Sequence, residues 1–206
     1  MVDRVSGGSG PDAADIVGSP QASTPAPPSP SGCGQRFGVA VPSLVTAYLG
    51  LGANLGQPEQ TLAAAVKAIR DWPDVEVCGV SRLYHSAPMG PQNQPDYCNA
   101  VLEIQTAQPA AGLLTLGQQT ESAFGRVRRE HWGARSLDID VLLYGDAQIQ
   151  TPSLRVPHPG LAERAFVVFP LMDLAPGLRL PGGQRLAAVA EQLQAEPLRR
   201  VQDWAP

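Results

Sequence analysis

The run TAYLGLG, residues 46–52, is a short apolar stretch that ends at glycine, and this pattern predicts a buried β-strand. The turn ANLG, residues 53–56, follows it directly. Apolar residues then recur at helical spacing at Leu62, Ala65, Val66 and Ile69. Trp72 and Pro73 end that pattern. The domain is therefore expected to open with a strand, a turn and an amphipathic helix.

Two β-rich runs follow the helix, at residues 75–84 and 97–104, and a Pro- and Gly-rich loop at 87–95 separates them. Pro109 then stands where the first turn of a helix tolerates proline, and apolar residues at helical spacing continue until Gly125. These patterns predict two more strands and a second helix.

The apolar run at residues 137–144 predicts a further strand, and the turn at Gly145 leads into a strand-like segment at 147–150, so a hairpin is expected. From Pro157 the chain predicts a C-terminal extension of turns with a short helix at 186–193. The order strand, helix, strand, strand, helix, strand is typical of a ferredoxin-like (split βαβ) α+β sandwich. The predicted fold is that sandwich with an added hairpin and a C-terminal extension.

Residues 1–42 consist mainly of Gly, Ser, Pro and Ala, which cannot bury enough apolar surface to offset the chain entropy lost on folding. They are expected to form a disordered tail, or to be translated sequence upstream of the true start. The chain as a whole has 206 residues and is 43% hydrophobic, a content that suits a packed domain. Residues 45–206 are the expected domain.

Composition also limits the classes of function. The net charge of −4 argues against a general nucleic-acid binder, which would carry a broad basic surface. The three cysteines, Cys33, Cys78 and Cys98, are odd in number and widely spaced, so neither a disulfide framework nor a zinc knuckle is indicated. No apolar run reaches the roughly 20 residues of a membrane-spanning helix. We expect a cytoplasmic protein that is a monomer and has no membrane or nucleic-acid partner.

The residues with the clearest chemistry lie at 125–140, where four arginines lead into Asp138 and Asp140. Alternation along a strand places these two carboxylates on one face, two residues apart, where they could share hard cations such as Mg²⁺. A bare Asp-x-Asp more often lies on a solvated sheet face. The preceding basic loop favours a polyphosphate held between the positive and negative groups.

The segment HWGARSLDIDVL, residues 131–142, resembles the signature of 6-hydroxymethyl-7,8-dihydropterin pyrophosphokinases. The segment at 84–99, with the pattern Y-x-S-x-P-x-G-P-Q-x-Q-x-x-Y-x-N, is similar to the pterin-binding loop and strand of that family. VPHP at 156–159 and R-x-F at 164–166 resemble its later elements. The likeness extends in the same order from about residue 47 to residue 176 and leaves the tail outside.

This resemblance implies transfer of diphosphate from ATP, the co-substrate, to hydroxymethyl-dihydropterin in folate biosynthesis. It implies that Asp138 and Asp140 hold two Mg²⁺ ions. The implied catalytic residues are Arg126, Arg135, Asp138, Asp140 and His158. The implied ATP-binding residues are Gln118, Glu121, Arg128, Arg135, Val141, His158 and Arg164. The implied pterin-binding residues are Ser86, Ala87, Met89, Tyr97, Asn99, Trp132 and Phe166.

Three other classes of protein share parts of these patterns. Gly50, Gly52 and Gly56 invite a dinucleotide-binding interpretation, but that fingerprint needs its third glycine where this chain has Leu55, so we interpret the glycines as turn residues. A nucleotidyl transferase on a ferredoxin-like palm also pairs aspartates around two metals, and it would release inorganic diphosphate rather than AMP. A non-catalytic binding module is disfavoured because it has no use for arginines beside two carboxylates.

Overall fold

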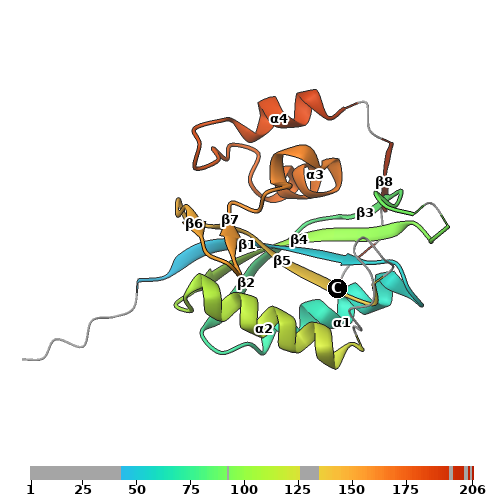
Figure 1. The fold of residues 1–206 in the computed structure, drawn as a ribbon, viewed down its shortest axis with the longest axis horizontal. Helices are drawn as coiled ribbons and strands as arrows, with labels where there is room; N and C mark the ends of the chain where they lie inside the picture. Colours follow the sequence, from blue (N-terminus) through green and yellow to red (C-terminus); the bar gives the residue numbers. More distant parts are fainter. Residues whose placement is uncertain (1–42, 92, 126–134, 195–196, 202–203, 205) are drawn as a thin grey trace, which may run out of the picture. The chain divides into compact units, whose positions relative to one another are not determined.

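A six-stranded antiparallel sheet lies at the centre of the molecule (Figure 1). The computed structural model describes residues 43–206 except 92, 126–134, 195–196, 202–203 and 205, so the predicted tail at 1–42 lies outside the described residues. The strand order is β5-β1-β4-β3-β8, and β2 also pairs with β4. These strands are β1 (Val45–Ala53), β2 (Val75–Val80), β3 (Leu83–Ser86), β4 (Tyr97–Thr106), β5 (Asp138–Tyr144) and β8 (Leu198–Val201).

Strand β1 confirms the first sequence prediction, and it is paired along both edges. One edge bonds to β4 in the register Leu49↔Leu102, and the other bonds to β5. Its apolar residues alternate between the two faces, because Leu49 and Leu51 point to one side while Tyr48 points to the other. A strand paired on both edges and covered on both faces accounts for the nearly continuous apolar run in the sequence.

Two helices cover one face of the sheet, α1 (Pro58–Arg70) and α2 (Ala110–Ala123), and both confirm predicted helices. The buried residues of α1 are Leu62, Ala65, Val66 and Ile69, which is the predicted apolar stripe. The Trp72 indole N–H, just after α1, donates to Thr120 Oγ1 of α2 at 3.1 Å. This bond joins the ends of the two helices inside a dry core, where an unpaired indole N–H would be costly.

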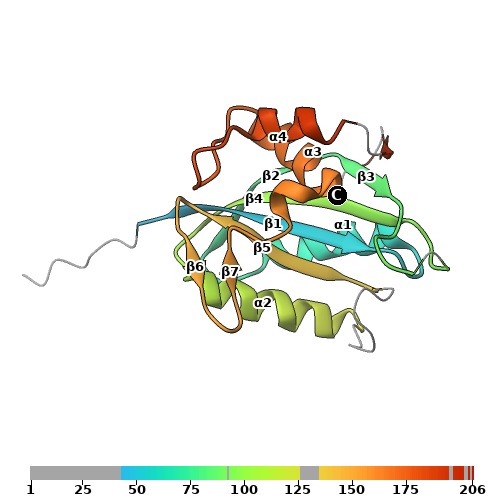
Figure 2. The ribbon, with the colours of Figure 1, turned by 45° about the horizontal axis from the view of Figure 1, so that its top comes forward.

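The opposite face is covered by α3 (Ala165–Leu174) and α4 (Leu186–Gln192), as Figures 1 and 2 show. The short helix at 186–193 was predicted, whereas α3 was expected to be part of a region of turns. Helix α3 is apolar on nearly every side and contains Pro170, so it lacks both the helical periodicity and the composition that identify a helix in sequence. It is stable because Val168 and Leu171 are fully buried between the sheet and α4.

The predicted strand at 75–84 is two strands, because the chain breaks at Ser81. The Ser81 backbone N–H donates to Val101 O at 2.9 Å, and its side-chain oxygen accepts the Val101 N–H at 2.8 Å. The hydroxyl also donates to Arg82 O at 2.8 Å. Side-chain bonds therefore replace ladder bonds at this point, which is a common use of serine.

The predicted hairpin between residues 137–144 and 147–150 is wrong. Residues 147–150 contain β6 (Ile149–Gln150), which pairs with β7 (Arg155–Val156) in a separate two-stranded sheet. β5 is at the edge of the main sheet, and other groups bond to its backbone instead. The Ile139 N–H donates to Glu121 Oε1 of α2 at 2.8 Å, and Leu142 O accepts the His158 N–H at 3.0 Å.

No helix in the described part of the chain is long and apolar enough to cross a lipid bilayer.

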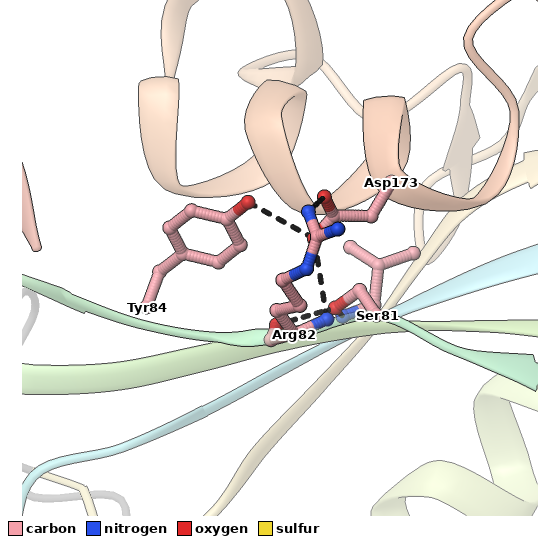
Figure 3. Close-up of polar contacts among 5 residues, drawn as sticks. Ser81, Arg82, Tyr84 and Asp173 are labelled. Atoms are coloured by element: carbon pink, nitrogen blue, oxygen red, sulfur yellow. Dashed lines mark hydrogen bonds and ion pairs between the residues drawn. The ribbon is translucent and has the colours of Figure 1, made fainter. Parts of the chain in front are cut away.

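A carboxylate on α3 ties that helix to the sheet (Figure 3). Asp173 Oδ2 accepts the Tyr84 hydroxyl at 2.9 Å and the Arg82 backbone N–H at 3.2 Å, and Asp173 Oδ1 pairs with the Arg82 guanidinium at 2.5 Å. Burial, followed by the hydrogen bond to Asp173, raises the pKa of Tyr84 to about 12. The buried phenol is therefore the stronger part of this contact, since the Arg82 side chain is 55% exposed.

The first prediction compares the two partners of Asp173. Tyr84→Phe should lower the free energy of unfolding by about 1–2 kcal/mol, because it removes a buried hydrogen bond to a charged group. Arg82→Ala should cost less than about 1 kcal/mol, because its guanidinium is largely in water. Urea unfolding of both variants measures this order, and a larger loss for Arg82→Ala would contradict it.

Candidate active site

One row of residues crosses four strands on the face that carries α3. Tyr84 of β3 is paired with Asn99 of β4, Asn99 with Gly52 of β1, and Gly52 with Asp138 of β5. Residues directly opposed in an antiparallel ladder point to the same side of the sheet. The register therefore sets an amide and a carboxylate on either side of a glycine.

The next row places the second carboxylate on the same face, because Asp140 is paired with Gly50. The intervening Ile139 is buried in the core on the helix α2 side. The prediction that Asp138 and Asp140 share one face is therefore confirmed. The interpretation of Gly50 and Gly52 as turn residues is wrong, since both lie within β1, and only Gly56 has the positive φ of such a turn, at 66°.

The two strand glycines leave the sheet bare between the polar groups. A Cβ on Gly52 would lie 3.5 Å from Asn99 Oδ1 and 3.9 Å from Asp138 Cβ, and a Cβ on Gly50 would lie 3.3 Å from Leu142. Glycine in a strand is otherwise unfavourable, and it often marks a place where another group approaches the backbone. Gly52 thus leaves the sheet surface between Asn99 and Asp138 free of any side chain.

Two basic residues lie beside the two carboxylates. The Arg135 guanidinium donates to Asp138, and His158 Nε2 lies 3.8 Å from Asp140 Oδ2. His158 Nδ1 accepts the Gly160 N–H at 3.1 Å, and this bond directs Nε2 toward the carboxylate. Burial is the main factor that lowers the pKa of His158; the Arg164 charge lowers it further and Asp138 opposes the change.

Arg164 comes close to this group because Gly160 leaves space for it. A Cβ on Gly160 would meet Arg164 Nε at 2.4 Å, so a larger residue there would displace the guanidinium. The guanidinium carbon also lies 6.0 Å from the centre of the Phe166 ring at the start of α3. Arg135 and His158 therefore lie beside Asp138 and Asp140, and Arg164 lies near His158.

The predicted pterin-binding residues of β3 and β4 lie on the same face. Asn99 is buried, and its amide donates to Ser86 Oγ at 2.9 Å and to Tyr84 O at 3.4 Å. Ser86 is paired in register with Tyr97. Ala87 and Met89 are exposed on the following loop, Met89 by 54%.

Two predicted nucleotide-binding side chains are placed differently. Glu121 is buried, and its Oε1 accepts the Ile139 N–H at 2.8 Å, between the two aspartates along β5. Val141 is buried in the core on the face opposite Asp140. Gln118 is exposed on α2. Arg126, Arg128 and Trp132 lie outside the described residues.

A second group of possible metal ligands lies on the α1 side of the sheet. The donor atoms of Glu59, His85 and Cys98 are within 4.8 Å of one another there. His85 Nε2 lies 3.2 Å from Glu59 Oε1. Burial is the main cause that raises the pKa of Cys98 to about 11, so without a metal its thiol is protonated at neutral pH. The two aspartates are the better candidates for a hard cation such as Mg²⁺, which prefers oxygen ligands.

Sequence reasoning missed Asn54, which is buried just after β1 and bonds to two segments that flank the site, at Gln94–Pro95 and at Arg135. A polar residue directly after an apolar strand is the only sign of it in sequence, and such residues are frequent in turns.

The chain is similar to known proteins over most of its described domain. Residues 48–176 match the family model described as 7,8-dihydro-6-hydroxymethylpterin-pyrophosphokinase (HPPK). The 2-amino-4-hydroxy-6-hydroxymethyldihydropteridine pyrophosphokinase of Haemophilus influenzae is 43% identical over 149 residues, which are 72% of this chain and 93% of that protein. The Pseudomonas aeruginosa protein of the same name is 41% identical over 154 residues, 75% of this chain and 95% of that protein.

Among solved structures, the chain is similar to wild-type Plasmodium falciparum HPPK-DHPS with SDX-DHP, with a TM-score of 0.57 and 11% identity. The match covers 73% of this chain and 44% of that chain, so this chain spans less than half of that solved protein. At this identity the likeness shows a shared fold: a mixed α/β domain built on an antiparallel sheet. The family model and the two bacterial relatives show more, namely that the chain belongs to the 7,8-dihydro-6-hydroxymethylpterin-pyrophosphokinase family.

Proposed function

We propose that this chain transfers diphosphate from ATP to 6-hydroxymethyl-7,8-dihydropterin, giving AMP and the pterin diphosphate in folate biosynthesis. The proposal rests on the row Asn99, Gly52 and Asp138. In this row an amide that can hydrogen-bond to a pterin ring lies near the two carboxylates, and only Gly52, which has no side chain, lies between them. Family membership supports the same reaction. We further infer that residues 45–206 are the catalytic domain and act as a monomer in the cytoplasm.

The donor set suits Mg²⁺. Asp138 and Asp140 present carboxylate oxygens on one face, and hard cations prefer such ligands together with phosphate oxygens. These two residues would hold two Mg²⁺ ions, which when bound would offset the negative charge of the triphosphate. Arg135 now donates to Asp138. Loss of that contact on metal binding would free the guanidinium for a phosphate.

The triphosphate would lie among the hydrogen-bond donors near the aspartates. Arg135, His158 and Arg164 offer donors there, and the sequence resemblance adds Arg126 and Arg128. Glu121 would act through β5, because its carboxylate fixes the backbone between the two aspartates. Val141 would contact the nucleotide only through its backbone, since its side chain is in the core. Gln118 is exposed on α2 and would contact only a part of the nucleotide that extends over that helix.

The pterin would lie over Gly52 beside Asn99. The carbonyl Oδ1 of Asn99 faces Gly52 and can accept from a ring N–H, while its amide is held by Ser86 and Tyr84. Phe166 and Tyr97 offer aromatic faces for stacking, and the resemblance adds Trp132. Backbone groups at Ser86, Ala87 and Met89 would contact the ring edge.

In the reaction, the hydroxymethyl oxygen loses its proton and bonds to the β-phosphorus of ATP. The bond from that phosphorus to the α–β bridging oxygen breaks, and AMP leaves with the bond pair. Positive groups around the reacting phosphate stabilise the charge that develops. This chain supplies them through Arg135 and Arg164, and His158 Nε2 adds a hydrogen-bond donor.

We also infer that the domain has the ferredoxin-like fold. The order β5-β1-β4 with β2 and β3 beyond, and with α1 and α2 on one face, supports a ferredoxin-like arrangement. The layer of α3 and α4 would be an addition to it.

The test of function is the product. Incubation with ATP, Mg²⁺ and hydroxymethyl-dihydropterin should yield AMP and pterin diphosphate in equal amounts. A nucleotidyl transferase would instead release inorganic diphosphate and attach AMP to its acceptor. Absence of AMP in the complete reaction would refute the proposal.

The metal assignment predicts that Asp138→Ala and Asp140→Ala each lower kcat at least about 100-fold, because each removes a metal ligand. The melting temperature should stay close to that of the wild type, since neither side chain is part of the apolar core. Asp146→Ala, an exposed acid in the turn after β5, is the matched control and should keep its activity. Chelation should stop turnover and added Mg²⁺ should restore it; near-normal rates in either site variant would contradict the assignment.

Because Gly52 has no side chain, adding a single methyl group there should weaken pterin binding. Gly52→Ala should raise the KM for the pterin about 10-fold, because the methyl lies between Asn99 and Asp138 at ordinary contact distances. The variant should fold normally, since the backbone there suits any residue. Gly50→Ala, whose methyl on the same face would lie 3.3 Å from the buried Leu142 side chain, is the control. Equal KM values for the two variants would show that Gly52 is not part of the pterin site.

A further inference from the structure

His85 and Cys98 are directly opposed in the ladder between β3 and β4, so both side chains point to the α1 side of the sheet. The Cys98 sulfur lies 3.7 Å from His85 Nδ1 and 3.8 Å from His85 Nε2. Glu59, in the first turn of α1, completes the group, because its Oε1 lies 3.2 Å from His85 Nε2. Two neighbouring strands and a helix therefore bring a sulfur, a nitrogen and an oxygen donor to one place.

The separations of these donors suit a tetrahedral metal ion. Zn²⁺ binds sulfur at about 2.3 Å and nitrogen or carboxylate oxygen at about 2.0 Å, so its ligand atoms lie roughly 3.3–3.6 Å apart. His85 Nε2 lies 3.2 Å from the oxygen and 3.8 Å from the sulfur, and all three donor atoms are within 4.8 Å of one another. Small side-chain rotations would bring them to the distances that the ion requires.

The donor types favour a different metal from the one that suits the two aspartates. Thiolate is a soft ligand and imidazole suits zinc, whereas Mg²⁺ takes oxygen ligands. As carboxylate and thiolate, Glu59 and Cys98 carry two negative charges, which balance a divalent cation, and His85 binds as the neutral imidazole. The proton that the thiol loses on binding passes to the solvent.

The surroundings of the group allow a cation to enter. Cys98 is fully buried, but the Glu59 side chain is 50% exposed, so an ion would reach the sulfur past the carboxylate. Two further charges act on Cys98, from Arg199, which is paired with His85 in register, and from Asp96 just before β4. Both are exposed and have opposite signs, so their effects largely cancel and are screened by water.

We propose that Glu59, His85 and Cys98 form a binding site for Zn²⁺, separate from the aspartate pair of the proposed active site. Water would supply the fourth ligand. The ion would join α1 to β3 and β4, on the side of these strands opposite Ser86 and Asn99. It would stabilise the folded chain, because the unfolded chain does not hold the three ligands together.

The test uses Co²⁺ as the probe, because it takes the place of Zn²⁺ and gives a charge-transfer absorption band when a thiolate is bound. The full-length protein carries Cys33→Ser and Cys78→Ser, so that Cys98 is the only cysteine left. Excess Mg²⁺ occupies sites made of oxygen ligands alone. We expect an equimolar amount of Co²⁺ to produce the band, and Zn²⁺ to remove it by displacing the cobalt.

Variants of the other two ligands show whether the site is the one proposed. Glu59→Gln and His85→Gln should each raise the Kd of Co²⁺ at least about 10-fold, because each weakens or removes a ligand. Glu59→Gln should fold normally, since half of that side chain is in water. Glu191→Gln, which changes an exposed acid on α4, is the matched control and should bind Co²⁺ as the parent does.

A second readout is thermal stability. With Mg²⁺ present, Zn²⁺ should raise the melting temperature of the parent and of its Asp138→Ala form alike, and it should raise that of His85→Gln much less. A parent protein that gives no thiolate band in excess Co²⁺ would overturn the site. Equal Co²⁺ affinities in Glu59→Gln, His85→Gln and Glu191→Gln would also overturn it. None of these readouts depends on turnover, so failure of the zinc site would leave the proposed function intact.

Discussion

Strand β1 is hydrogen-bonded along both edges, and this double pairing determines where the polar groups of the site lie. Its register against β4 places Asn99 opposite Gly52, and its register against β5 places Asp138 opposite the same residue. A shift of one residue in either ladder would turn the whole set to the other face, since side chains alternate along a strand. The apolar residues of β1 oppose such a shift, because Leu49 and Leu51 would leave the core.

The two faces of the sheet have different roles: one packs the apolar core and the other carries the polar residues of the site. On one face α1 and α2 enclose a dry core, and even Glu121 in that layer is used to bond the backbone of β5. On the other face α3 and α4 cover only part of the sheet, and the rows that contain Gly50 and Gly52 carry the polar residues. The contact of Asp173 with Tyr84 and Arg82 fixes α3 over this face, and Phe166 begins the same helix (Figure 3). Stability and chemistry thus use opposite sides of the same strands.

The site also depends on bonds between segments that carry no regular structure. Arg135 precedes β5, and Gln94 and Pro95 precede β4, so neither is held by a ladder. Asn54 supplies the missing hydrogen bonds from a rigid position at the end of β1. Loops positioned by a rigid scaffold are a common way to combine precise geometry with substrate access.

Local patterns in the sequence were enough to predict those helices and strands whose structure depends mainly on their own residues. The stripe Leu62 to Ile69 specifies α1 because helical spacing alone puts those residues on one face. Asp138 and Asp140 share a face because the period of a strand is two, whatever the rest of the chain does. The family resemblance, read from residues 84–166, pointed to Arg135 and His158, which the structure places beside Asp138 and Asp140.

Tertiary packing decided what no local pattern could express. Helix α3 contains Pro170 and is apolar on most sides, so only its burial between the sheet and α4 makes it helical. The break at Ser81 depends on Val101, twenty residues away, and the partners of Asn54 lie 40 and 81 residues away. The two strand glycines could not be told from turn glycines until the ladders placed Asn99 and Asp138 beside Gly52. Such bonds form only between groups that the completed fold brings together, and for that reason they leave no periodic trace in the sequence.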